Sequence, residues 1–108
     1  MNWLILIIAG LFEVGFAFSL SKYKITTGVA SQLWISSFFI CLVISMLLLY
    51  KASLTIPMGT AYAVWTGIGA TGTVIVGIIF FSEPADFWRM FFISTLIASV
   101  VGLKFVSN

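Results

Sequence analysis

Glu13 is the residue of this chain best suited to chemistry, because it is an acid in the middle of an apolar run. No other acidic residue precedes Glu83, and the run from Trp3 to Leu20 contains no Lys or Arg that could neutralise it. A charged side chain at the centre of a bilayer costs about 2.5–3.5 kcal/mol on insertion scales. A membrane span that carries this carboxyl group therefore needs a proton or a cation as its partner. The residue type and its position predict a group that exchanges a proton for cationic cargo.

The composition places the chain in the membrane class. Of its 108 residues, 62% are hydrophobic and 7% are charged, whereas a soluble domain averages about 25% charged residues. The net charge of +2 is too small to suggest a nucleic-acid partner. The chain has no His and a single cysteine, Cys41. We therefore expect no His- or Cys-based metal site and no cofactor.

Four segments are long and apolar enough to cross a membrane, which takes about 20 residues. They are residues 2–21, 32–50, 58–81 and 87–106, joined by short connections of polar and turn-forming residues. These spans leave no room for a soluble domain. The sequence predicts an all-α membrane protein, a single domain over residues 1–108 with four transmembrane helices.

The basic residues give little preference for either orientation in the membrane. With four spans, Lys51 and Lys104 lie on the side of the termini, and Lys22, Lys24 and Arg89 lie on the opposite side. The positive-inside rule counts only Lys and Arg, and a tally of 2 against 3 is nearly balanced. Either other features set the orientation, or the chain inserts both ways and pairs antiparallel. Composition alone does not choose between these explanations.

Residues that could surround the carboxylate gather on the first three spans. On a helix, the small Gly10 and the aromatic Phe16 share a face with Glu13. The third span places Tyr62 and Trp65 on one face, where a ring attracts cations and a phenol can donate to a carboxylate. The second span has a weakly polar stripe of Ser37, Cys41 and Ser45. A hydroxyl on such a stripe as often bonds its own helix as a ligand.

The fourth span carries no residue suited to chemistry. Its small residues Ala98, Ser99 and Gly102 include two at the spacing of a helix-pairing surface. We expect this span to serve assembly by packing against another helix.

Together these motifs resemble the small multidrug resistance family of bacterial transporters. The run from Pro57 to Gly69 reads Pro-Met-Gly-Thr-Ala-Tyr-Ala-Val-Trp-Thr-Gly-Ile-Gly, and Ala-Gly-Leu-Phe-Glu ends at Glu13. The likeness covers nearly the whole chain, including its length, the four spans and Glu83-Pro84 in the last connection. The form Trp-Thr-Gly-Ile-Gly is more like the guanidinium-exporter subtype than the quaternary-ammonium subtype, which more often reads Trp-Ser-Gly-Val-Gly.

The resemblance implies an antiparallel, dual-topology dimer in the bacterial inner membrane that exchanges protons for a cation by alternating access. It implies no enzymatic activity, and it makes Glu13 the shared site for proton and substrate. The pocket residues that it implies are Gly10, Phe16, Ser45, Tyr62 and Trp65, and the hinge residues are Gly67 and Gly69. The partners implied are a small cation, protons, membrane lipid, and a second copy or a paralogous chain.

Two departures from the guanidinium-exporter pattern bear on selectivity and assembly. Phe16 stands where that subtype usually carries Trp, and Phe cannot donate the hydrogen bond that an indole N–H gives to the glutamate. The first connection is also longer than usual in that subtype. Some members of the family work only as heteromeric pairs, and this chain could be one half of such a pair.

Three interpretations follow. The first is a proton-coupled antiporter that exports small organic cations, guanidinium or a substituted guanidinium. The second is a broader exporter of quaternary ammonium compounds, because Phe16 loosens the hydrogen-bond network that favours a planar cation. The third is a membrane subunit that is inactive without a partner chain. The mid-span acid beside Tyr62 and Trp65 argues against the third.

Overall fold

The computed structural model describes residues 2–107, which form four helices joined by three connections. The helices are α1 (Asn2–Ile25), α2 (Gly28–Ser53), α3 (Met58–Phe80) and α4 (Phe87–Ser107). Each of them is long and apolar enough to cross a membrane. The helical form satisfies every backbone group within its own segment, as the bilayer interior requires. The predicted all-α membrane fold with four transmembrane helices is confirmed.

The first connection is much shorter than predicted, because the predicted spans left residues 22–31 between them. α1 continues to Ile25 and α2 begins at Gly28, so only residues 26–27 separate the two helices. The hydroxyl of Thr26 donates to the carbonyl of Lys22 at 2.8 Å and closes the end of α1. Gly28 has a φ of 67°, a left-handed backbone conformation that favours glycine. Lys22 and Lys24 lie in the last turn of α1, from which their long side chains can reach water.

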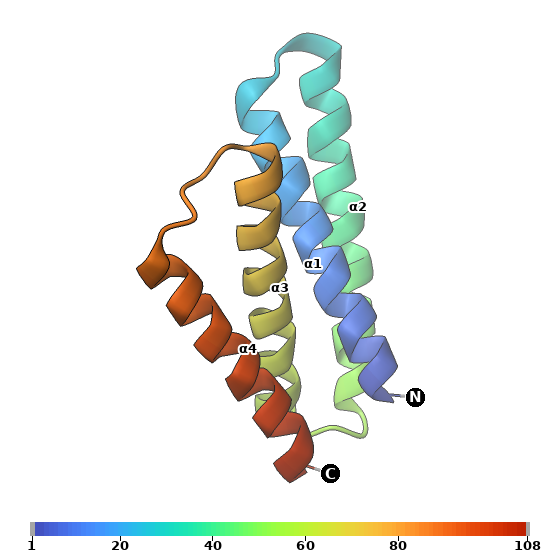
Figure 1. The fold of residues 1–108 in the computed structure, drawn as a ribbon. Helices are drawn as coiled ribbons and strands as arrows, with labels where there is room; N and C mark the ends of the chain where they lie inside the picture. The colour runs from blue at the N-terminus through green and yellow to red at the C-terminus, as the bar shows by residue number, and fades with distance from the viewer. Residues whose placement is uncertain (1, 108) are drawn as a thin grey trace.

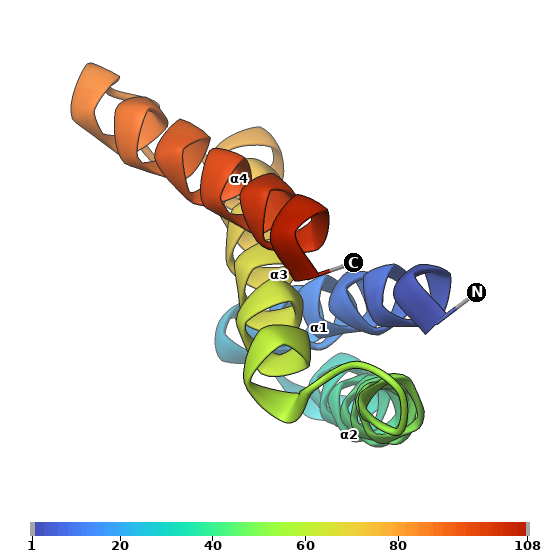
Figure 2. The ribbon, with the colours of Figure 1, turned by 90° about the horizontal axis from the view of Figure 1, so that it is seen from below.

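α1, α2 and α3 form a bundle, and α4 lies along one side of it (Figure 1). α1 packs against both α2 and α3, while α4 packs mainly against α3. Figure 2 shows α4 on the side of α3 away from α2. α1, the helix that carries Glu13, therefore packs against α2 and α3, and α4 stands at the edge of the bundle.

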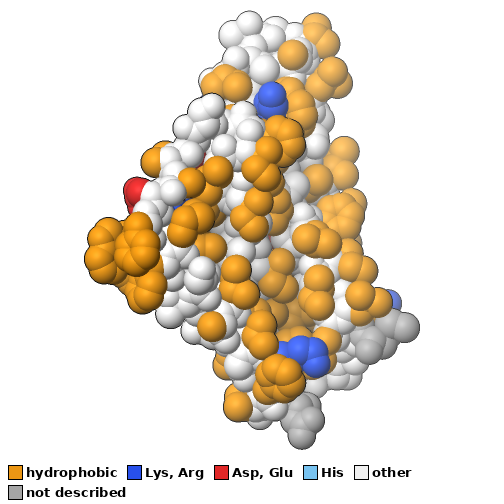
Figure 3. All heavy atoms as spheres, viewed as in Figure 1, with side chains coloured by type: hydrophobic (Ala, Val, Ile, Leu, Met, Phe, Trp, Pro, Cys, Tyr) orange, Lys and Arg blue, Asp and Glu red, His pale blue; other side chains and the backbone are white. Residues whose placement is uncertain are grey.

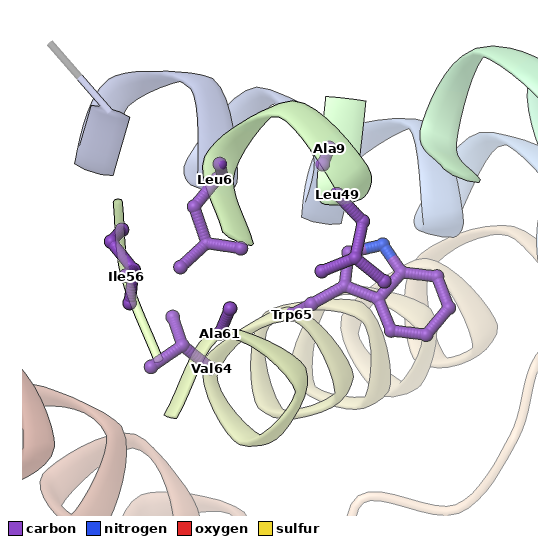
Figure 4. Close-up of a cluster of buried hydrophobic side chains, with 8 residues drawn as sticks. Leu6, Ala9, Leu49, Ile56, Ala61, Val64 and Trp65 are labelled. Carbon is purple, nitrogen blue, oxygen red and sulfur yellow. The ribbon is translucent and has the colours of Figure 1, made fainter. Parts of the chain in front are cut away.

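A small apolar core lies where α1, α2 and α3 meet near the second connection (Figure 4). Its buried residues are Leu6, Ala9, Leu49, Ala52, Ile56, Ala61, Val64 and Trp65. Helices associate in lipid through close packing of small residues, because lipid is as apolar as their side chains. The two alanines of α1 and α3 in this core, Ala9 and Ala61, are fully buried and let the helices approach closely.

Most large apolar side chains point outward, as expected for a chain surrounded by lipid. Figure 3 shows hydrophobic side chains over most of the visible face and few charged ones. An exposed aromatic cluster at the start of α4 comprises Phe87, Trp88, Phe91 and Phe92. Trp is enriched at the membrane–water interface, so Trp88 suits a position there. At the other end of α4, the Nζ of Lys104 lies 5.3 Å from the ring centroid of Trp3 on α1.

Candidate functional site

The Glu13 side chain lies in the seam between α1 and α3, against the backbone of Gly69. A Cβ added to Gly69 would overlap the carboxylate of Glu13. The carboxylate oxygen Oε1 is buried and has no hydrogen-bond partner among residues 2–107. Among residues 2–107 the one salt bridge joins Arg89 to Glu83, so no Lys or Arg in this range pairs with Glu13. A buried acceptor without a partner is costly, which makes this oxygen a strong acceptor for a proton or a cationic N–H donor.

The α1–α3 seam holds the carboxylate in place because glycines alternate with larger side chains along it. A Cβ on Gly10 of α1 would lie 2.6 Å from the side chain of Ile68 on α3. A Cβ on Gly72 of α3 would meet the side chain of Val14 on α1. Gly10, next to Glu13 on its face of α1, is thus a packing contact with α3 and keeps the two backbones close.

Ser45 and Trp65 form a buried chain of hydrogen bonds that joins three helices. Trp65 Nε1 donates to Ser45 Oγ at 2.9 Å, and Ser45 Oγ donates to the carbonyl of Ala9 at 2.8 Å. Ser45 is 0% exposed and Trp65 is 5% exposed. Ala9 lies one helical turn before Glu13, so this chain fixes α1 to α2 and α3 beside the carboxylate. Both polar groups are satisfied by the protein in this conformation.

Tyr62 and Phe16 take no part in the hydrogen bonds that join Trp65, Ser45 and Ala9. Tyr62 is 55% exposed, and its ring centroid is 5.6 Å from that of Trp65. Phe16 packs edge to face against Phe38 of α2, with the ring centroids 5.7 Å apart. The Phe16 ring therefore contacts α2, whereas the Glu13 carboxylate contacts α3. The structure brings Ser45 and Trp65 together and leaves the Tyr62 side chain open to the surroundings of the chain.

The two glycines predicted as a hinge lie within an uninterrupted helix. α3 is continuous from Met58 to Phe80, and both glycines are buried. A Cβ on Gly67 would meet Val100 of α4, and one on Gly69 would meet Glu13. Close approach of neighbouring side chains is thus one reason for glycine at both positions. Their role as a hinge remains a prediction.

The small residues of the fourth span face away from the rest of the chain. Ala98, Ser99 and Gly102 are exposed, and a Cβ on Gly102 would have no atom of another residue within 4 Å. α4 contacts α3 through its opposite side, where Leu96 and Val100 meet Gly67. Packing of another chain on the small-residue face remains a prediction.

One polar contact was not anticipated from the residue pattern. The hydroxyls of Ser19 and Ser37 hydrogen-bond each other at 2.9 Å and link α1 to α2. Ser19 is buried, and it also donates to the carbonyl of Gly15. The isolated polar residues on two adjacent spans were the only signal for this contact, and the relative rotation of the helices decides whether such residues meet.

Four helices long and apolar enough to cross a membrane define a multi-pass membrane protein, and the acid between α1 and α3, Glu13, has no basic partner among residues 2–107. A family model described as Small Multidrug Resistance protein matches residues 1–97, and the chain belongs to this family. The predicted family is therefore confirmed.

Individual relatives agree with the subtype. The chain is 48% identical over 105 residues to a guanidinium exporter of Salmonella typhimurium, covering 96% of each chain. It is 44% identical over 107 residues to a probable guanidinium efflux system subunit of Bacillus licheniformis, covering 99% of this chain and 100% of the relative. It is also 44% identical over 105 residues to a guanidinium exporter of Escherichia coli, again covering 96% of each chain. These are names of transporters and not of enzymes, and the predicted likeness to the guanidinium-exporter subtype is confirmed.

Proposed function

We propose that this protein exports guanidinium, or a singly substituted guanidinium, across the bacterial inner membrane in exchange for protons. The observation that carries the proposal is the Glu13 carboxylate, which lies between α1 and α3 with an oxygen that has no partner among the described residues. The names of the relatives support guanidinium as the cargo.

Proton and cargo would compete for the same carboxylate. A protonated Glu13 is neutral and offers little attraction to a cation, whereas the ionised form attracts one strongly in a water-poor site. A guanidinium ion is planar, and its N–H groups fit the two oxygens of a carboxylate as a fork. Cargo therefore binds as the proton leaves, and this exclusion couples the two movements. Trp65 would present its ring to the cation.

Two copies of the chain would form the pocket, inserted in opposite orientations. One chain leaves the Tyr62 side chain and the small-residue face of α4 exposed, and a second copy would cover both. Membrane helices pair readily through such small-residue faces. The nearly balanced basic residues also suit a chain that inserts both ways.

Locking the orientation of one chain is expected to abolish its activity when it is expressed alone. Leu54→Lys and Thr55→Lys in the exposed second connection, together with Lys24→Gln, change the basic tally to 4 against 2. Thr27→Lys, Ala85→Lys and Lys51→Gln bias the chain the other way. Cells that express each form alone should be sensitive to guanidinium, and cells that express both should recover resistance. Full resistance from one locked form would contradict the antiparallel dimer.

The cargo is tested by comparing cations with the purified chain reconstituted in vesicles. Guanidinium is expected to give a transport current that depends on the pH gradient, and tetramethylammonium a smaller one. If only tetraalkylammonium ions are carried and guanidinium does not compete with them, the cargo assignment is wrong. The broader quaternary ammonium exporter would then be the correct interpretation.

A heteromeric transporter is a second candidate, because the Bacillus licheniformis relative is named as a subunit of an efflux system. In that case the chain alone would give no current in the same vesicles. Current would appear only when a second chain of the family is co-reconstituted. Activity of the purified chain alone would exclude this candidate.

A further inference from the structure

A small cavity lies in the α1–α3 seam beyond Glu13, and the proposed exchange makes no use of it. Its volume is about 20 Å³. Ala17 and Ser21 line it from α1, Thr73 and Gly77 line it from α3, and Glu83 lines it from the third connection.

The cavity lies between Glu13 and the end of the bundle. Ala17 follows Glu13 by one turn of α1, and Thr73 follows Gly69 by one turn of α3. Because Glu13 and Gly69 are in contact, the cavity begins about 6 Å farther along the same seam. The seam thus leads from the buried carboxylate to the third connection.

The Glu83 carboxylate is held at the outer end of the cavity. A Cβ added to Gly77 would lie 2.5 Å from its Oε1 and 2.8 Å from its Oε2. The Glu83 N–H donates to the Gly77 carbonyl at 3.1 Å, and Arg89 Nη2 donates to Glu83 Oε1 at 2.7 Å. The Glu83 side chain is nevertheless 44% exposed. The Glu83 side chain therefore reaches water outside while it borders the cavity.

The two hydroxyls of the cavity are free to bind a ligand. Helical hydroxyls elsewhere, such as those of Ser94 and Thr95 on α4, donate to a carbonyl of the preceding turn. Ser21 and Thr73 make no such hydrogen bond within residues 2–107, where the side-chain hydrogen bonds involve other residues. A buried water needs two to four polar partners and a cavity of about 10–15 Å³ or more. The cavity meets both requirements.

Size and charge exclude the cargo from this cavity. A volume of about 20 Å³ holds one water but not a guanidinium ion. Two cationic side chains near the mouth of the cavity would also repel a cationic cargo. Arg89 is paired with Glu83. Lys22 Nζ lies 5.7 Å from the ring centroid of Phe81, which also lines the cavity. The remaining nearby acid, Asp86, accepts a hydrogen bond from the Arg89 N–H.

We propose that this cavity binds one water molecule between Ser21, Thr73 and Glu83, and that this water relays protons between the membrane surface and Glu13. The inference rests on the proposed proton exchange at Glu13. A proton from outside water that reaches the Glu83 end of the cavity passes to the bound water, which gives one of its own protons to the Thr73 hydroxyl. The Thr73 hydroxyl passes its original proton on to Glu13, so the water and the hydroxyl are both regenerated. Glu13 does not line the cavity. The last transfer therefore needs the seam to open, which prevents a permanent proton leak.

Two variants test the relay by different changes. Thr73→Val keeps the shape of the side chain and removes its hydroxyl, and Gly77→Ala places a methyl group where the Glu83 carboxylate lies. Guanidinium is mixed with the purified protein, and proton release is followed with a pH indicator in H₂O and in D₂O. Each variant is expected to bind guanidinium with unchanged affinity at equilibrium and to release protons at least about tenfold more slowly. The D₂O effect should also be larger than in the wild type.

Matched controls separate the relay from general damage. Thr95→Val removes an exposed hydroxyl outside the cavity, and Gly59→Ala adds a methyl group where no other atom lies within 4 Å. Both should release protons at the wild-type rate. Wild-type rates in Thr73→Val and Gly77→Ala as well would overturn the relay while leaving the proposed antiport intact. Absence of proton release from the wild type would instead overturn the antiport, and the relay with it.

Discussion

Glu13→Gln is expected to reduce guanidinium transport driven by a pH gradient to the level of empty vesicles. Glutamine has nearly the same volume, so it can fill the space against Gly69 that the carboxylate occupies. It cannot ionise, and it therefore neither attracts a cation nor carries a proton. Uptake of radiolabelled guanidinium into proteoliposomes measures the effect, and thermal unfolding in detergent shows whether the fold is retained.

Asp86→Asn is the matched control for this substitution. Asp86 is exposed in the third connection, and its carboxylate accepts a hydrogen bond from the Arg89 N–H at 2.8 Å. The amide oxygen of Asn can accept the same bond, so wild-type uptake is expected. If uptake driven by a pH gradient persisted in Glu13→Gln, Glu13 could not be the coupling site.

Gly69→Ala is expected to give the second largest loss of transport, although it changes no polar group. The added methyl group would overlap the Glu13 carboxylate and force it out of the seam, or push α1 away from α3. Overpacking of this kind typically costs about 1–3 kcal/mol. A loss at the upper end of that range is about a hundredfold in binding or rate. The rate of guanidinium uptake and the affinity for guanidinium should therefore each fall by about tenfold or more.

Gly59→Ala is the control for the backbone effect of this change. Gly59 is also in α3, and its added methyl group would meet no atom of another residue within 4 Å. Both substitutions raise helix propensity, by about 1 kcal/mol, so only steric overlap distinguishes them. Combining Gly69→Ala with Glu13→Gln should lower transport no further than Glu13→Gln alone, because both act through one carboxylate. Wild-type transport by Gly69→Ala would show that the seam does not position Glu13.

The sequence by itself determined the class of this protein, its four helices and its one intramembrane acid. These properties follow from local composition, because a bilayer accepts only long apolar segments whose backbone groups are satisfied internally. An acid such as Glu13 stands out in that setting, since its cost in lipid is large whatever the packing. The motif from Pro57 to Gly69 likewise indicated the family that the comparison confirms.

Only the tertiary structure decided which side chains meet. Almost every face of these helices is apolar, so the sequence does not say which face turns inward, and lipid supplies no hydrophobic force between helices to reveal it. The fit of large side chains against glycines sets the rotation of each helix, and this placed Glu13 on Gly69. The same rotation gave Ser45 the Ala9 carbonyl and the Trp65 indole as partners, where its spacing had equally allowed a bond within its own helix. It also turned Phe16 toward Phe38 of α2. This contact depends on how two helices pack together, so neither segment of the sequence predicts it alone.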